Sequence, residues 1–352
     1  MELNLKRREL IQGLRGIAII LVVAHHAISN FNSVVLWNSF AKYIDMFHVN
    51  IFFFIAGYLF MEHREKYEKQ GFRRFIVAKA KTIFLPYYVS TFLFSVCVKI
   101  GFMVPQVTEL LQQRGYFEKN ILNMLVDPFW FHNPYFMSLW FIYVLFAYFI
   151  IAWFHSRMRI TIQSVVALIF ASMLVNAFCY NLYPDIVYKF IRYYPYFVLG
   201  MTFSKATGKT IYFGKKEIVA ASICFLVIAL RVFIIDISFM QRHIKAVYMQ
   251  AEWFLCAMSA LVVLAALVEL LLRKEKQRRL VYIGDRSYHI YLFHNPWIII
   301  PVAIVTSSFI SSVAINIVAN FAFGITIPII IDVIYKKLRQ GKCNGNQNKK
   351  YR

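Results

Sequence analysis

The stretch from Ile11 to Phe31, IQGLRGIAIILVVAHHAISNF, limits the fold more than any other part of the chain. It is an apolar run long enough to enter a bilayer as a helix. It nevertheless carries Arg15 near its start and two adjacent histidines, His25 and His26, near its end. Ionisable side chains inside a membrane segment are costly and usually face a bundle interior, a partner or a water-filled cavity. We therefore expect these three residues to mark a functional site.

The spacing places Arg15 and His26 on the same side of the expected helix. Eleven steps of about 100° return a helix to within roughly 20° of its starting face, with a rise of ~16 Å. His25 lies about 100° away from that face. The pattern predicts a guanidinium near the inner side of the membrane and an imidazole in its outer half, both facing one space.

Composition indicates a multi-pass membrane protein, because 60% of the 352 residues are hydrophobic. The net charge of +22 does not indicate nucleic acid as a partner, since the basic residues form short clusters between apolar runs. We therefore expect the lipid bilayer as a partner and no nucleic acid. The five cysteines show no close pair and no metal-ligand spacing. We expect neither a disulfide framework nor a bound metal.

The apolar runs predict an all-α bundle of about ten transmembrane helices. Their approximate ranges are 13–31, 43–61, 83–103, 136–154, 161–180, 186–204, 217–236, 252–272, 284–302 and 306–334. Most of the 39 Lys and Arg residues lie in segments 1–12, 62–82, 155–160, 205–216, 273–283 and 335–352. The loops on the other side hold only Lys42, Arg114, Lys119, Arg242 and Lys245. This bias predicts that both termini are cytoplasmic.

One membrane domain, residues 1–340, accounts for nearly the whole chain, and we expect residues 341–352 to form a disordered basic tail. The first apolar run follows basic residues as in a signal peptide, but no cleavage site follows it, so we expect a retained helix. The longest outer loop, about 104–135, is rich in aromatics. It is either an interfacial aromatic belt or a cap over the acceptor side.

Two further histidines are expected inside the bundle. His48 lies about five residues from the outer end of the second span, at a depth similar to that of His26, and His294 lies ~15 Å from the inner face. Each has a structural reading as a hydrogen-bonded packing residue, and for His26 the aligned Arg15 favours a function. The acidic residues lie near the ends of the spans, which disfavours a cation-coupled transporter with a carboxylate at midplane.

The inner segment 62–82 carries a dense set of basic side chains: Arg64, Lys66, Lys69, Arg73, Arg74, Lys79 and Lys81. The positive-inside rule alone accounts for such a loop. Clustered Arg and Lys also bind phosphate oxygens through charge-assisted hydrogen bonds. Coenzyme A offers phosphates at one end and a thioester at the other, so its anionic end would stay in the cytoplasm while the thioester reaches into the bundle. Arg15 is placed to steady it.

Several motifs resemble the acyltransferase family 3, the bacterial integral-membrane O-acyltransferases of surface polysaccharides. Gly13-Leu14-Arg15-Gly16 with His26 resembles the signature of the first helix, and FHVNIFFFIAGYLF (Phe47–Phe60) resembles that of the second. Further similar motifs are Arg73-Arg74 through Tyr88, Leu139-Trp140-Phe141, Tyr196–Gly200 and the block GDRSYHIYLFHNP (Gly284–Pro296). The chain departs from the family pattern at Asn50, Ala56, Lys79 and Lys81.

The resemblance implies an O-acyltransferase of the cytoplasmic membrane that takes an acyl group, acetyl foremost, from acetyl-CoA or another acyl-CoA. The acceptor would be a glycan or lipid-linked sugar. His26 is implied as general base, with Arg15, Trp140 or backbone donors stabilising the oxyanion. Arg73, Arg74, Lys79 and Lys81 are implied in donor binding, and His25, His48, Trp140, Ser287 and His294 in substrate binding. Direct transfer and an acyl-histidine intermediate both remain open. The alternative from another class is a transporter or flippase of lipid-linked sugars.

Overall fold

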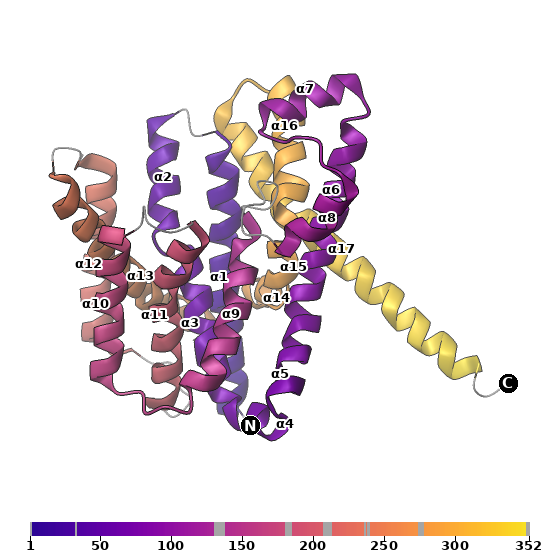
Figure 1. Ribbon diagram of the computed structural model, residues 1–352. Helices are drawn as coiled ribbons and strands as arrows, with labels where there is room; N and C mark the ends of the chain where they lie inside the picture. Colours follow the sequence, from indigo (N-terminus) through magenta and orange to yellow (C-terminus); the bar gives the residue numbers. More distant parts are fainter. Residues whose placement is uncertain are drawn as a thin grey trace.

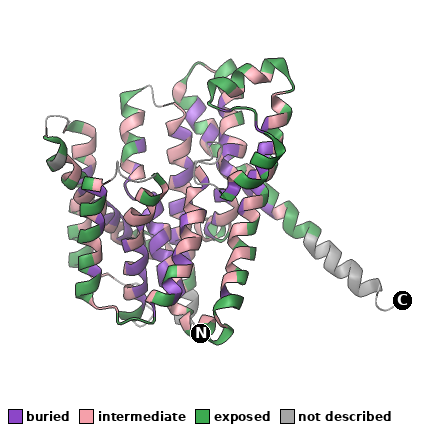
Figure 2. Cartoon of the chain, in the orientation of Figure 1, coloured by how far each residue is buried: buried purple, intermediate pink, exposed green. Residues whose placement is uncertain are grey.

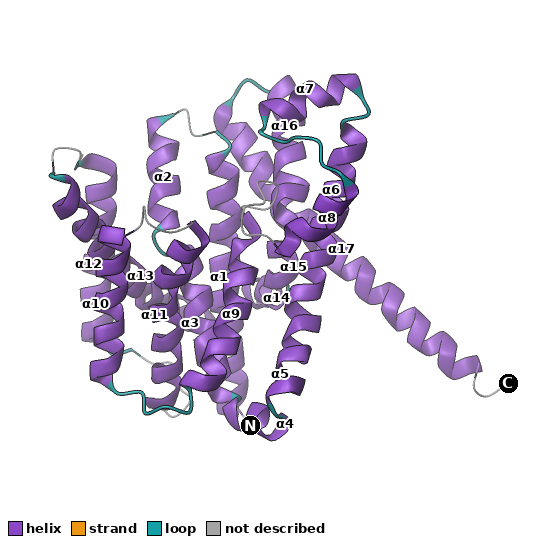
Figure 3. Cartoon of the chain, viewed as in Figure 1, coloured by secondary structure: helices purple, strands orange, loops and turns teal. Residues whose placement is uncertain are grey.

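The computed structural model describes residues 2–31, 34–129, 138–179, 185–206, 213–235, 237, 240–273 and 278–349. The described residues form helices and connecting segments without a strand, which confirms the all-α prediction (Figure 3). In chain order the elements are α1 (Glu2–Ser29), α2 (Val35–Asp45), α3 (His48–Glu62), α4 (Arg64–Gln70), α5 (Phe72–Lys79), η1 (Ala80–Phe84), α6 (Leu85–Gly101), α7 (Pro105–Gln113), α8 (Ile121–Val126), η2 (Asp127–Phe129), α9 (Trp140–His155), α10 (Ile162–Cys179), α11 (Asp185–Ala206), α12 (Lys215–Ile234), α13 (Arg242–Arg273), α14 (Arg278–Asp285), α15 (Ser287–Phe293), η4 (His294–Ile298), α16 (Ile299–Phe309) and α17 (Val313–Lys349).

Eight helical stretches among the described residues are long and apolar enough to cross a membrane. They are Arg7–Ser29, Val35–Glu62, Phe72–Gly101, Ile162–Cys179, Lys215–Ile234, Ile244–Leu272, Ser287–Phe309 and Val313–Leu338. Helices are the natural spanning form because each backbone group is satisfied within the segment. The other two predicted spans coincide with α9, which is apolar but shorter, and with α11. Ten spans and cytoplasmic termini stay predictions.

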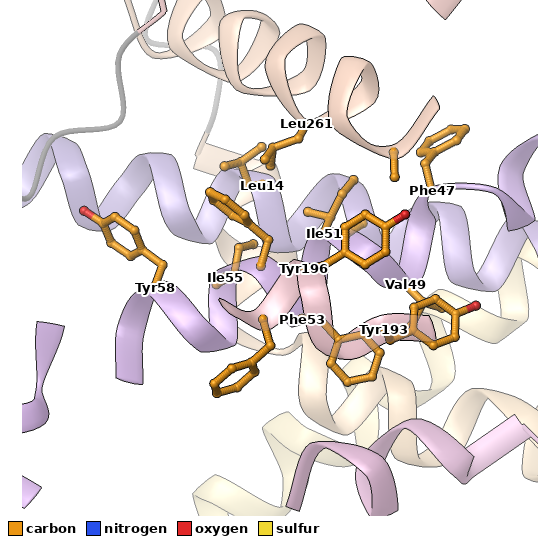
Figure 4. Close-up of a cluster of buried hydrophobic side chains, with 14 of the residues drawn as sticks. Leu14, Phe47, Val49, Ile51, Phe53, Ile55, Tyr58, Tyr193, Tyr196 and Leu261 are labelled. Atoms are coloured by element: carbon orange, nitrogen blue, oxygen red, sulfur yellow. The ribbon is translucent and has the colours of Figure 1, made fainter. Parts of the chain in front are cut away.

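Helix α1 runs through the middle of the bundle beside α3, and α11 packs against α3 (Figure 1). Buried side chains concentrate on these central helices, whereas the outward faces of α10 and α12 are exposed (Figure 2). The apolar exposed faces suit contact with lipid. Figure 4 shows part of the core, in which Phe53 of α3 stacks on Tyr193 of α11 with ring centres 5.3 Å apart.

Two helix pairs approach so closely that only glycine fits between their backbones. A Cβ atom at Gly57 of α3 would lie 1.9 Å from the carbonyl oxygen of Phe197, and one at Gly200 of α11 would lie 2.0 Å from that of Phe54. The same holds where α14 crosses α1, because a Cβ at Gly284 would lie 1.8 Å from the Gln12 oxygen. Small residues at such crossings let membrane helices pack backbone to backbone.

Two spans are broken near their middle, and a histidine lies at each break. The second span changes from α2 to α3 at Met46 and Phe47, so that His48 opens α3. The span Ser287–Phe309 changes from α15 to the π-helical η4 at His294, and Asn295 has non-helical backbone angles. Irregular backbone inside a membrane bundle is tolerated where it is buried in protein or lines a cavity.

Two buried carboxylates inside the described spans have basic partners. Asp332 of α17 is buried and contacts Arg286 at 3.1 Å, His289 at 3.2 Å and Lys336 at 2.7 Å. Glu252 of α13 pairs with Arg231 of α12. Burying a carboxylate requires such partners. These acids therefore have structural partners where a cation-coupled transporter would need a carboxylate to bind its ion.

Two predictions about the organisation of the chain concern the segment 104–135 and the boundary at residues 340/341. The outer segment expected as a loop at 104–135 contains the short helices α7, α8 and η2, and its Asn133–Pro134 lies outside the described residues. A hydrogen bond joins this segment to α6, because the Tyr87 hydroxyl donates to the Pro128 carbonyl at 3.1 Å. The expected boundary between domain and tail at 340/341 falls inside α17, and this division stays a prediction.

Candidate active site

Four imidazoles from three separate segments lie in one continuous row. The ring centre of His48 lies 5.0 Å from that of His25, His25 lies 5.1 Å from His26, and His26 lies 5.2 Å from His294. We call these four residues the histidine row. His48 thus meets His25, not His26 as its depth in the sequence suggested. Helix α1 supplies the two central rings, and the two broken spans supply the outer ones.

The outer two rings have defined tautomers because their Nδ1 atoms face backbone carbonyl oxygens. His48 Nδ1 lies 2.8 Å from the Ile44 oxygen, and His294 Nδ1 lies 2.8 Å from that of Tyr291. A carbonyl only accepts, so each Nδ1 carries a hydrogen and donates it, and each neutral ring keeps an unprotonated Nε2. His294 Nε2 is buried and has no hydrogen-bonding partner among the described residues.

The two central rings face different neighbours. His26 Nδ1 lies 3.4 Å from the amide nitrogen of Asn295, the residue after His294. His25 Nε2 lies 3.8 Å from a carboxylate oxygen of Asp45 at the end of α2. Adjacent residues of a helix point about 100° apart, and here that difference sends His26 toward η4 and His25 toward α2 and α3.

A cavity of about 340 Å³ lies beside α1 at Arg15, eleven residues before His26 in the same helix. Arg15, Lys79 and Ser287, three of the residues singled out in the sequence, all line it. The rest of its wall is mainly aromatic and aliphatic, with contributions from α3, η1, α9 and α15. We call it the Arg15 cavity. It combines two cations with a largely apolar wall, as a site for a ligand with an anionic end and a neutral arm requires.

The polar groups of the Arg15 cavity come from four segments. Arg15 Nη1 donates to Gln12 Oε1 at 3.3 Å, which leaves most of its guanidinium hydrogens for a ligand. Lys79 Nζ lies 4.2 Å from the ring centre of Phe149 and donates to the Tyr67 hydroxyl at 3.4 Å. Burial, together with the charge of Glu62, raises the pKa of Tyr67, so its hydroxyl keeps its hydrogen at neutral pH. Ser287 Oγ is buried without a partner among the described residues.

Tyr291 separates the Arg15 cavity from the histidine row. It lines the cavity, and its ring centre lies 5.7 Å from that of His294. Its hydroxyl donates to the Ser138 carbonyl at 2.6 Å, which fixes the ring in place. The cavity therefore ends one aromatic ring away from the row.

The remaining residues expected in the site lie apart from these two features. Arg73, Arg74 and Lys81 are exposed on α5 and η1, the segment that also carries Lys79. Trp140 begins α9 and packs 5.1 Å from the Tyr193 ring, with Lys189 Nζ 5.0 Å from its own ring centre. It is not among the residues that line the Arg15 cavity.

Sequence reasoning missed Asn295, Asp45 and Tyr291. The only signal for Asn295 was its place beside His294 in the block Gly284–Pro296, and Tyr291 lies in the same block. Asp45 gave no signal, because it was expected near the end of a continuous span. Its position depends on the break between α2 and α3.

The comparison with known proteins supports one family. A family model described as an acyltransferase domain, that of acyltransferase family 3, matches residues 9–335. No curated protein and no solved structure matches the chain. The match contains all four histidines of the row and every residue that lines the Arg15 cavity. The chain therefore belongs to acyltransferase family 3, and it is a membrane acyltransferase that transfers groups other than amino-acyl groups.

Proposed function

We propose that this protein takes an acyl group, acetyl foremost, from cytoplasmic acyl-CoA and transfers it to a hydroxyl of a surface or exported glycan. It would do so as a multi-pass protein of the cytoplasmic membrane. The observation that carries the proposal is the position of His26, which lies in a row of imidazoles one aromatic ring away from a cavity with two cations. Membership of the family supplies the reaction type.

His26 is the proposed general base. Asn295 has one amide donor group and one acceptor, and its oxygen is buried without a partner among the described residues. In the structure the amide nitrogen faces His26 Nδ1 at 3.4 Å. In the proposed catalytic arrangement the Asn295 amide is turned by half a rotation, so that its oxygen accepts the Nδ1 hydrogen and Nε2 is free to take a proton. Imidazole is suited to this task near neutral pH.

In direct transfer, His26 takes the proton of the acceptor hydroxyl as the oxygen attacks the thioester carbonyl. The new carbon–oxygen bond forms, the carbon–sulfur bond breaks, and the thiolate of coenzyme A leaves and receives the proton from the imidazolium. Preorganised donors stabilise the negative charge on the carbonyl oxygen. Direct attack needs no covalent enzyme intermediate, and it is the route that we favour over an acyl-histidine.

The Arg15 cavity is the proposed seat of the donor. Arg15 and Lys79 supply positive charge, and the apolar wall suits the uncharged arm of coenzyme A. Arg73, Arg74 and Lys81 flank Lys79 on the exposed side and would meet the phosphates. The acceptor would approach from the opposite end of the row, near His25, His48 and Trp140. No metal takes part in this proposed transfer.

Thioester cleavage by the purified protein in detergent tests the proposal. Wild-type protein should release free thiol from acetyl-CoA in an acceptor-dependent manner, and His26→Ala should lose this activity. A well-folded wild-type protein that moves lipid-linked sugar across vesicles without cleaving any thioester would favour the flippase alternative. Mass and NMR analysis of surface glycan from a deletion strain and its parent would identify the modified hydroxyl.

A further inference from the structure

Beside the proposed base, three side chains converge that take no part in the proposed proton transfer. His25, Asp45 and His48 each present a nitrogen or carboxylate oxygen, and these ligand atoms all lie within 4.8 Å of one another. They come from α1, from the end of α2 and from the start of α3. Two imidazoles and one carboxylate are a common set of protein ligands for Zn²⁺.

The spacing within this group suits an ion better than direct pairing. His25 Nε2 and Asp45 Oδ1 are 3.8 Å apart, which is too long for a hydrogen bond. Two imidazoles bound to one tetrahedral ion at ~2.1 Å have ring centres about 5 Å apart, and those of His25 and His48 are 5.0 Å apart. Ligand atoms around such an ion lie roughly 3.4 Å from each other. The ligand atoms lie within 4.8 Å of one another, so a contraction of up to about 1.4 Å would complete the geometry.

The surroundings of the two histidines support the same reading. His48 Nδ1 donates to the Ile44 carbonyl at 2.8 Å, the arrangement that orients metal-binding histidines. His25 Nδ1 is buried without a partner among the described residues, and Nε2 has only the distant Asp45. Nε2, the nitrogen that faces Asp45, is therefore available to an ion. The Asp45 side chain is 41% exposed, which gives an ion access.

We propose that His25, Asp45 and His48 bind one divalent transition-metal ion, Zn²⁺ foremost. Three neutral or anionic ligands leave a fourth position for water. The bound ion would join the end of α1 to the break between α2 and α3. The expectation of no metal was drawn from the cysteine spacing, and these ligands were invisible to it because His25 lies on a different span from Asp45 and His48. This proposal concerns binding and does not depend on the proposed acyl transfer.

Metal binding is measured directly on the full-length protein, purified in detergent with a histidine-free affinity tag. The protein is stripped with a chelator and dialysed against Zn²⁺, and bound zinc is measured by mass spectrometry. Parallel samples receive Co²⁺ and are scanned for the visible absorption of a tetrahedral site. Wild type should bind one equivalent, and Zn²⁺ should raise its melting temperature. Asp45→Asn and His48→Gln should each weaken binding at least about 10-fold, the lower end of the cost of losing even an outer-shell partner.

His289→Gln is the matched control, since His289 also lies 3.2 Å from a carboxylate but has no second imidazole beside it in the part of the chain that the structure describes. It should retain the zinc equivalent and the rise in melting temperature. Asp45→Asn keeps the shape of a part-exposed side chain, so it tests binding even if the buried His48→Gln fails to fold. Wild-type protein that binds no more zinc than Asp45→Asn, or equal loss in His289→Gln, would overturn the proposal.

Discussion

His26 Nδ1 and the amide nitrogen of Asn295 lie 3.4 Å apart, although the two residues belong to different spans. This contact joins α1 to the irregular start of η4. It gives the amide control over which nitrogen of His26 carries a hydrogen.

Asn295→Ala should therefore lower kcat more than it changes either Michaelis constant. The expected loss is up to about 10-fold, the size of one ordinary hydrogen bond. Asn295→Asp tests orientation separately, because a carboxylate accepts the Nδ1 hydrogen without ambiguity, and it should retain more activity than Asn295→Ala. Steady-state kinetics at matched expression decide the point. Equal activity in wild type and Asn295→Ala would show that the amide does not orient the base.

The two adjacent histidines should behave differently when each is replaced. His26→Ala should lose at least the ~100-fold typical of a general base while the protein still inserts and accumulates. His25→Ala should lose far less activity, mainly through lower stability, because its ring faces Asp45 and His48. Turnover per molecule, with melting temperature alongside, separates the two effects. A dead His25→Ala beside a near-normal His26→Ala would refute the assignment of the base.

Donor affinity should depend on the basic segment around α5. Replacing Arg73 and Arg74 together by Ala should raise the Michaelis constant for acyl-CoA more than that for the acceptor. Replacing both by Lys should have a smaller effect if charge alone matters, and an equal effect if the forked guanidinium is needed. An unchanged donor constant in the Ala variant would remove these arginines from the donor site.

Stability should respond sharply to a single methyl group at the crossing of α3 and α11. Gly57→Ala places a Cβ 1.9 Å from a backbone oxygen, so the helices must separate. The expected loss is about 1–3 kcal/mol or more, the usual cost of overpacking. Gly214→Ala is the control, because its new Cβ meets only the flexible end of the Glu217 side chain. Thermal unfolding in detergent compares the two, and equal melting temperatures would contradict the close crossing.

Topology is tested with single cysteines in a cysteine-free background. A reporter at the exposed Gln112, in the predicted outer segment 104–135, should react with an impermeant thiol reagent added to intact cells. A reporter at the exposed Gln70, in the basic segment, should react only after the membrane is permeabilised. The reverse labelling would exchange the proposed donor and acceptor sides.

The sequence predicted much of the site because helical periodicity is a local property. Arg15 and His26 do lie along one side of α1, with Arg15 in the cavity beside Ser287 and His26 against His294. The stacking of His25 on His48 was not predictable, since it depends on where the second span breaks. Asn295 was missed for a similar reason, because its non-helical backbone turns the amide toward His26. Contacts that depend on long-range packing and on breaks in a helix leave no periodic pattern.

The glycine crossings also determine which parts of this molecule can move. Where α3 meets α11, and α1 meets α14, backbone touches backbone, so these helices cannot slide past each other without a steric clash. The segment α5–η1, on the edge of the Arg15 cavity, is held instead by side-chain contacts, such as the Tyr288 hydroxyl that donates to the Ile83 carbonyl at 2.8 Å. Opening of the cavity to admit a large donor molecule would therefore be a movement of α5–η1 relative to the closely packed helices α1, α3, α11 and α14. His26 would keep its position in α1 during that movement.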